Sequence, residues 1–282
     1  MTPHAGHAGS PSALRTFALQ AWAFLRRDLQ VEASYRANVL LGAVSAFVLL
    51  VVLYYVGQTV GTSRALQGYG GDYFAFSLVG FAAAAPLHAS LLQLARRVRE
   101  AQMTGTLEAI LTTPVGPARA VLLSALLPLA GSALRMAALL VGGWTLFGLP
   151  FARANLGAAA VVLLLALASY VPLGLLSASF TLRFKRGDPV AAFLDLASVL
   201  LGGVFFPVAV LPMPLQAAGR MLPLTHALEA LRLALLRNAP LAELLPQLRA
   251  LSLSAAVLLP FAFVLFRAAV RRARDDGSLT HF

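Results

Sequence analysis

Residues 39–56 read VLLGAVSAFVLLVVLYYV and lie within a longer stretch, Ala37 to Ser63, that carries no charged side chain. A helix needs about 20 apolar residues to cross the roughly 30 Å hydrocarbon core of a bilayer. This stretch therefore predicts a membrane-spanning helix and not the core helix of a water-soluble domain.

The composition of the whole chain agrees with a membrane protein. Of its 282 residues, 59% are hydrophobic and 12% are charged, and the mean hydropathy is +0.80. An average soluble domain is about 45–50% apolar and about 25% charged. A soluble fold would have too few charges to cover this apolar surface, and the same apolarity excludes a disordered chain. The absence of Cys excludes disulfides, thiolate metal sites and Cys nucleophiles.

Six apolar stretches predict an all-α polytopic membrane protein with six transmembrane helices. Together they form one transmembrane domain of residues 37–270. The fifth stretch contains Gly202, Gly203 and Pro207, so a single straight helix is doubtful there. The predicted spans are residues 38–57, 73–95, 119–147, 156–181, 189–210 and 247–268.

The distribution of charge predicts the orientation of the chain. The net charge of +11 comes from 22 basic and 11 acidic residues, and the basic residues fall between the apolar stretches. They form no single patch, which argues against a nucleic-acid partner. With both termini inside, 15 basic residues lie on the cytoplasmic side and six on the other, as the positive-inside rule requires. The Arg, Ala and Leu usage is typical of a GC-rich bacterial genome, so we expect a bacterial plasma (inner) membrane protein.

The segments that flank the spans are expected to have different structures. Residues 1–13 are small, polar and rich in Gly and Pro, which predicts a disordered tail and not a signal peptide. Residues 14–36 alternate apolar and charged side chains at helical spacing. They predict an amphipathic interfacial helix on the cytoplasmic membrane surface, with a helix packed on a soluble partner as the alternative. Residues 271–282 are expected to form a cytoplasmic tail.

The connection between the second and third predicted spans reads RRVREAQMTGTLEAILTTPVGPARA, from Arg96 to Ala120. Gly105 and Pro114 bound a short segment with the pattern of an amphipathic helix. Connections in helical bundles are typically about 2–8 residues long, so this one is long for a simple linker. A short, partly apolar helix at the cytoplasmic surface predicts contact with another protein.

A second informative segment is GGVFFPVAVLPMPLQAAGRMLPLTHALEALRLALL, from Gly202 to Leu236. It is too apolar for an ordinary external loop, and its prolines break it too often for one spanning helix. Irregular backbone at membrane depth persists only where protein or a water-filled cavity covers it. The segment therefore predicts an outer re-entrant hairpin of short helices between spans five and six.

These segments resemble the permease subunits of type-2 ATP-binding-cassette exporters, the ABC-2 family. EAQMTGTLEAILTTPV resembles the first cytoplasmic loop of that family, and GGVFFPVAVLPMPLQ followed by LPLTHALEALR resembles its pattern around the fifth span. RDLQVEASYR resembles its N-terminal interfacial helix. The motifs occur in the family order, and the resemblance covers about residues 15–270.

The resemblance implies a permease that forms the translocation pathway of an exporter and is driven by a separate ATPase subunit. It also implies two copies of that ATPase, a second permease copy or paralogue, and membrane lipid as partners. A short coupling helix in the first cytoplasmic loop would dock on the ATPase. The resemblance assigns Glu100, Gly105, Thr106, Leu107, Glu108 and Pro114 to the coupling loop. It assigns Phe206, Pro207, Pro212, Pro223, His226, Glu229 and Arg232 to the outer re-entrant motif.

The sequence contains no ATP-binding motif of its own. A P-loop needs Gly-Lys-Ser/Thr, because its backbone N–H groups and its Lys hold the phosphates. The one Lys of the chain is Lys185, which follows Phe184 and precedes Arg186. We therefore expect a non-enzymatic transport subunit that binds no cofactor or metal, with ATP and Mg²⁺ on the partner subunit.

Arg135, Asp195 and His88 fall well inside predicted spans, where ionisable residues are rare and usually functional. At about 1.5 Å per residue, Arg135 lies about 22 Å and Asp195 about 9 Å from the inner surface. That difference predicts no pairing between them. Glu229 is the better expected partner of Arg135, and outward snorkelling is the alternative. His88 is expected to be a hydrogen-bonded packing residue, and His226 to be structural.

Two other classes of protein are weaker alternatives. An intramembrane serine protease needs Ser and His facing each other, whereas His88 and Ser90 are two residues apart on one helix and point in different directions. An ion-coupled secondary transporter or channel without an ATPase would have inverted repeats or several buried ionisable groups, and the sequence has no repeat. The apolar composition of the predicted pathway favours an amphipathic small molecule or lipid as substrate.

Overall fold

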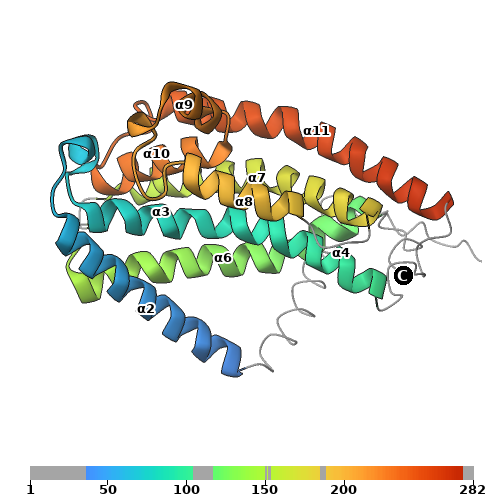
Figure 1. The fold of residues 1–282 in the computed structure, drawn as a ribbon, viewed down its shortest axis with the longest axis horizontal. Helices are drawn as coiled ribbons and strands as arrows, with labels where there is room; N and C mark the ends of the chain where they lie inside the picture. The colour runs from blue at the N-terminus through green and yellow to red at the C-terminus, as the bar shows by residue number, and fades with distance from the viewer. Residues whose placement is uncertain (1–35, 104–116, 150, 152–153, 185–188, 276–282) are drawn as a thin grey trace, which may run out of the picture.

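The computed structural model describes residues 36–103, 117–149, 151, 154–184 and 189–275. Within these ranges the regular structure is helical, and the one strand-like feature is an isolated β-bridge between Thr62 and Asp72. Figure 1 shows long helices packed side by side along the longest axis of the molecule. The predicted all-α architecture is confirmed.

Twelve helical elements make up the described chain. The π-type turn η2 joins α3 to α4 without a break, so the two form one long helical stretch. The longer elements are α2 (Arg36–Val60), α3 (Tyr73–His88), α4 (Leu94–Met103), α6 (Pro117–Phe147), α7 (Leu156–Phe184), α8 (Pro189–Leu201), α9 (Met213–Arg220), α10 (Pro223–Leu236) and α11 (Leu245–Asp275). The short ones are η1 (Arg64–Tyr69), η2 (Ala89–Gln93) and η4 (Val208–Val210).

Five helical stretches of the described chain are long and apolar enough to cross a membrane. They overlap the first, second, third, fourth and sixth predicted spans. The stretches are Leu40–Val60, Tyr73–Ala101, Leu126–Phe147, Leu156–Arg183 and Leu245–Ala273.

The fifth predicted span, residues 189–210, is not a single helix. The α8 helix has 13 residues and ends at Leu201. At about 1.5 Å per residue it is roughly 20 Å long, which is shorter than the hydrocarbon core. Gly203 then adopts φ +93°, a left-handed conformation that glycine reaches without steric cost. The chain turns there instead of continuing as a helix.

The prolines after this turn begin short helices. Pro207 precedes η4, Pro212 precedes α9, and Pro223 occupies the first turn of α10. Proline is well suited to these positions, because its fixed φ fits a first turn whose backbone N–H would have no helical partner. The same residues that interrupt the predicted span therefore build the α9–α10 hairpin.

The α10 helix lies in the core of the bundle. Its side chains Leu224, Leu228 and Leu231 are almost fully buried. It packs against α3, α7 and α11, so the second arm of the predicted re-entrant hairpin is an internal helix. The backbone at the break after α8 is covered by protein at Gly202, Gly203 and Val204, which are buried, as a membrane environment requires.

Close packing of η2 on α7 holds the centre of the bundle together. Ser90 Oγ donates a hydrogen bond to the carbonyl oxygen of Tyr170 (2.7 Å), and Ser177 Oγ donates to that of Leu91 (2.9 Å). A Cβ atom at Gly174 would overlap the carbonyl oxygen of Ser90. Small residues permit this approach between membrane helices.

Several described connections between helices lie at one end of the molecule (Figure 1). At this end, the backbone N–H of Asn155 donates to the carbonyl oxygen of Ala234 (2.9 Å). The Asn155 side-chain amide donates to that of Ala239 (3.1 Å). These bonds tie the α6–α7 connection to the α10–α11 connection. They place both connections on one side of the bundle, as predicted.

Several predictions concern the segments beyond these helices. The tail 1–13, nearly all of the interfacial helix 14–36 and the coupling segment 104–116 lie outside the described residues. The α11 helix continues to Asp275, so the first residues of the predicted tail 271–282 extend the last helix.

Candidate functional site

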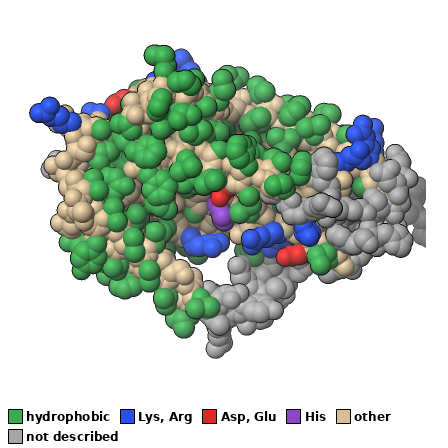
Figure 2. All heavy atoms as spheres, viewed as in Figure 1, with side chains coloured by type: hydrophobic (Ala, Val, Ile, Leu, Met, Phe, Trp, Pro, Cys, Tyr) green, Lys and Arg blue, Asp and Glu red, His purple; other side chains and the backbone are tan. Residues whose placement is uncertain are grey.

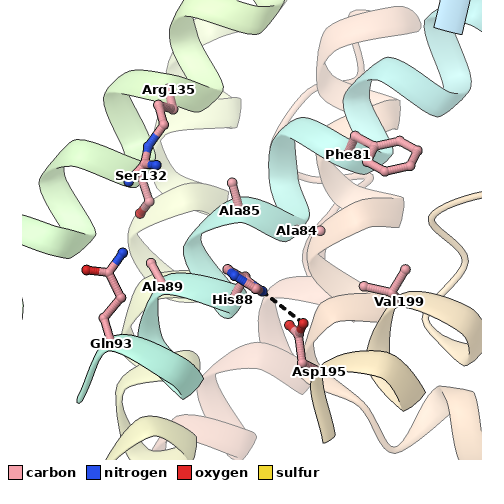
Figure 3. Close-up of a pocket in the computed structure, with 10 residues that line it drawn as sticks. All are labelled: Phe81, Ala84, Ala85, His88, Ala89, Gln93, Ser132, Arg135, Asp195 and Val199. Atoms are coloured by element: carbon pink, nitrogen blue, oxygen red, sulfur yellow. Dashed lines mark hydrogen bonds and ion pairs between the residues drawn. The ribbon is translucent and has the colours of Figure 1, made fainter. Parts of the chain in front are cut away.

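The polar residues predicted within the membrane meet at one pocket. It has a volume of about 270 Å³ and lies between α3, η2, α6 and α8. Figure 3 shows Arg135 on one side of this pocket and the pair His88 and Asp195 across from it. The lining residues are Phe81, Ala84, Ala85, His88, Ala89, Gln93, Ser132, Arg135, Asp195 and Val199. We call this the intramembrane pocket.

A direct contact joins His88 of α3 to Asp195 of α8. His88 Nδ1 lies 2.8 Å from Asp195 Oδ2, and the ring N–H donates to the carboxylate. The His88 side chain is 56% exposed and that of Asp195 is 18% exposed. The second carboxylate oxygen, Oδ1, is buried without a hydrogen-bond partner among the described residues. The sequence predicted a hydrogen-bonded His88 but did not predict that its partner is a carboxylate on another helix.

The structure places Arg135 near the middle of α6. It lines the same pocket as Asp195, although the two form no ion pair in the described structure.

The expected pairing of Arg135 with Glu229 is not present among the described residues. Glu229 lines a separate pocket with Tyr69 and Arg232. The hairpin folds into the bundle between α3, α7 and α11, and this carries Glu229 away from α6. A linear depth count could not show this, because it does not specify which helices are neighbours.

The intramembrane pocket opens on an apolar surface. Figure 2 shows a small group of charged and histidine side chains set among hydrophobic ones in the middle of the face that it displays. Intramembrane ionisable groups are rare and usually face a bundle interior or an aqueous cavity. Arg135 and the amide of Gln93 have no hydrogen-bond partner among the described residues. The pocket thus offers free donors at membrane depth.

A second polar centre surrounds Arg232 of α10, whose side chain is 3% exposed. Its Nε and Nη2 donate to the carbonyl oxygen of Phe76 (3.2 and 3.1 Å), and Nη2 also donates to that of Val204 (3.1 Å). Its guanidinium lies 3.4 Å from the centre of the Phe76 ring. The Val204 carbonyl belongs to the break after α8, so Arg232 satisfies a backbone group that the turn releases. A Cβ atom at Gly80 would obstruct this contact.

Other residues of the predicted outer motif lie around Arg232. Pro207 and Glu229 line a small pocket beside it, and Phe206 is half-buried in the turn that leads to η4. Burial and, next, the negative charge of Glu229 raise the pKa of Tyr69 above its ordinary value, while Arg232 acts in the opposite direction.

The turn between α9 and α10 is fixed by side-chain hydrogen bonds. Thr225 Oγ1 donates to the carbonyl oxygen of Gly219 (2.5 Å), and His226 Nε2 donates to that of Arg220 (2.8 Å). Both acceptors lie at the end of α9, where the last carbonyls lack the usual N–H partner four residues further along the helix. His226 therefore has a structural contact, and Pro212 and Pro223 start the two helices that it joins.

The predicted coupling loop is described only at its beginning. Glu100 is exposed in α4, which ends at Met103. Five of its predicted residues lie outside the described residues: Gly105, Thr106, Leu107, Glu108 and Pro114. In the described part of the chain, no three His, Asp or Glu side chains are grouped to hold a metal ion.

The spanning helices and the intramembrane pocket define a multi-pass α-helical membrane protein. The family model described as ABC-2 family transporter protein matches residues 58–264. The chain belongs to this family and is the membrane permease of an ABC transporter. The matched residues include the motif in the first cytoplasmic loop and the motif around the fifth span. The segment RDLQVEASYR, residues 27–36, lies before the matched residues. A comparison with curated proteins finds no match.

Proposed function

We propose that this chain forms the translocation pathway of an ABC exporter and is driven by ATP hydrolysis on a separate polypeptide. The family match carries the proposal. The missing Gly-Lys-Ser/Thr motif supports a separate ATPase, because without it no P-loop can hold nucleotide. ATP and Mg²⁺ would accordingly bind the partner.

The position of the coupling segment supports an ATPase on one end of the bundle. The α4 helix ends and α6 begins at the same end as the C-termini of α7 and α11 (Figure 1). Basic residues collect towards this end, as expected for a cytoplasmic face. They include Arg96, Arg97, Arg99, Arg183, Arg267, Arg271 and Arg272. We place this end, with both termini, in the cytoplasm of a bacterial cell.

The proposed assembly contains two permeases and two ATPase subunits. The α2 helix contributes little to the bundle core and exposes large apolar side chains, including Phe47, Val52 and Tyr55. A second permease copy or lipid would cover such a surface. The two-plus-two composition follows from the resemblance of the motifs to those of dimeric permeases.

The intramembrane pocket also gives some support to a second candidate function. His88, Asp195 and Arg135 line one cavity, and an ion-coupled secondary transporter needs ionisable groups of this kind. Such a transporter would work without an ATPase. Activity measurements therefore separate the two candidates.

The purified permease alone should hydrolyse no ATP. Activity should appear when a separate P-loop subunit is co-purified with it, because that subunit supplies the phosphate-binding Lys. The measurement is phosphate release by the permease, by the ATPase and by the complex. Replacing the P-loop Lys of the ATPase is the control, and it should abolish activity of the complex. ATP hydrolysis by pure permease, or ATP-independent transport driven by an ion gradient, would contradict the proposal.

Single cysteines introduced into this Cys-free chain should report its sidedness. Gly68→Cys and Met213→Cys should react with a membrane-impermeant maleimide from outside the cell; both residues are exposed, and Met213 is 84% exposed. Gly116→Cys and Gly187→Cys should react only after the membrane is opened. External labelling of Gly116→Cys would invert the proposed topology and remove the coupling loop from the cytoplasm.

A further inference from the structure

The intramembrane pocket holds hydrogen-bond donors that the described chain leaves without acceptors. Arg135 reaches it from α6 and Gln93 from η2 (Figure 3). Neither side chain has a hydrogen-bond partner among the described residues. An unpaired cation at membrane depth is unfavourable unless water, protein or a ligand supplies an acceptor. The natural complement of these donors is an anion.

The charges around the pocket also favour an anion. Arg135 and Arg96 are both close enough for their positive charges to act on His88. Asp195 is the one carboxylate among the lining residues. Its Oδ2 accepts from His88, and its Oδ1 is buried. A cationic ligand would therefore find both carboxylate oxygens occupied or covered, whereas the guanidinium of Arg135 is exposed to the pocket.

Apart from Ser132, the rest of the lining is apolar. Phe81, Ala84 and Val199 contribute apolar side chains, and Figure 3 shows Phe81 and Val199 on the side away from Arg135. The volume of about 270 Å³ is near the lower limit of small-molecule pockets, which run from about 300 to 1,000 Å³. The pocket is suited to a charged group joined to an apolar body.

We propose that the intramembrane pocket binds an amphipathic anion, a carboxylate or phosphate on an apolar body. Arg135 contacts the anionic group, Gln93 donates a further hydrogen bond, and the apolar side chains hold the body of the molecule. The His88 contact keeps the Asp195 carboxylate occupied and so reduces its repulsion of the ligand. This inference rests on the proposed function, because it assigns a substrate class to the permease.

Binding can be measured on the full-length permease without any ATPase. The protein is placed in nanodiscs of phosphatidylcholine, and radiolabelled laurate is titrated in a scintillation proximity assay. Laurate should bind saturably, and Arg135→Gln should weaken binding at least about tenfold, since a hydrogen-bonded charge contributes about 1.5–3 kcal/mol. Arg135→Lys should retain part of the affinity. Arg64→Gln removes an exposed Arg outside the pocket and should leave binding unchanged.

A second variant tests the sign of the charge effect. Asp195→Asn keeps the shape and an oxygen acceptor for His88 but removes the negative charge of the pocket. It should bind laurate as tightly as the wild type or more tightly. A purely structural role of the cluster would instead make Asp195→Asn and Arg135→Gln weaken binding and lower the melting temperature together. If Arg135→Gln does not fold, the wild-type preference for laurate over dodecyltrimethylammonium decides.

The lipid composition of the nanodisc distinguishes two sources of the anion, a membrane lipid and a free amphiphile. If phosphatidylglycerol in the nanodisc displaces laurate, the pocket binds an anionic membrane lipid; if it does not, the pocket selects a free amphiphile. Unchanged laurate affinity in Arg135→Gln, or tighter binding of dodecyltrimethylammonium, would overturn the inference. Either of these outcomes would leave the proposed coupling to a separate ATPase unaffected. Conversely, a permease that binds laurate but fails to stimulate any ATPase would refute the proposed function alone.

Discussion

A permease carrying Glu108→Arg should insert and fold normally but lose transport and permease-dependent stimulation of the ATPase. The proposed coupling helix presents Glu108 to a basic residue of the ATPase, and Leu107 and Leu111 to an apolar groove. Truncating one member of a buried, hydrogen-bonded charge pair costs about 2–5 kcal/mol. A reversed charge should lower docking affinity by at least about 30-fold. ATPase stimulation in proteoliposomes and pull-down of the ATPase are the measurements.

The matched control is Glu243→Arg. Glu243 is exposed in the α10–α11 connection at the opposite end of the molecule, so the same charge change there should leave coupling intact. A reciprocal charge reversal on the ATPase should partly restore activity to Glu108→Arg. If Glu108 only stabilised its own helix through the helix dipole, the effect would be about 0.3–1 kcal/mol. Wild-type coupling by Glu108→Arg would therefore leave only that local role.

Replacing Gly174 by Ala should destabilise the bundle by about 3 kcal/mol. A Cβ atom there meets the backbone carbonyl of Ser90, which cannot rotate away as a side chain would. The η2 turn must then move off α7, with loss of the hydrogen bond from Ser90 to Tyr170. Overpacking of this kind typically costs about 1–3 kcal/mol, and the loss of the hydrogen bond places this site at the upper end. Unfolding in mixed detergent micelles gives the free energy.

Gly131→Ala is the control for this prediction. Gly131 lies in α6, and a Cβ atom there would have no heavy atom within 4 Å. Ala is favoured over Gly in a helix by about 1 kcal/mol, so Gly131→Ala should be neutral or stabilising. Equal stability of the two variants would show that the contact between η2 and α7 is less tight than the structure has it.

The features that depend on local sequence were predicted well. Uncharged stretches such as Ala37 to Ser63 form long helices, because in a membrane every backbone group must be paired within its own segment. The break after α8 was also foreseeable. Gly202, Gly203 and Pro207 stand together, and no helix continues through such a combination without cost. The length of a spanning helix and its interruption are both properties of consecutive residues.

The candidate site could be predicted only as a set of separate residues. The sequence marked His88, Asp195 and Arg135 as unusual, because ionisable groups rarely occur in spans. It gave Arg135 an expected partner, Glu229, that lines a separate pocket in the structure. Hydropathy measures apolarity along one helix and contains no information about the neighbours of that helix.

The sequence by itself thus determined that this is a helical membrane protein, where its long helices lie, and that the segment after α8 is broken. Only the tertiary structure decided which polar groups meet. His88 contacts a carboxylate 107 residues away, and Arg232 donates to a carbonyl 156 residues away. The Arg232 contact depends on the close approach at Gly80, and the contact between η2 and α7 on that at Gly174, where a missing side chain lets backbone meet backbone. Pairing between distant segments follows from that three-dimensional packing, which no local pattern of residues encodes.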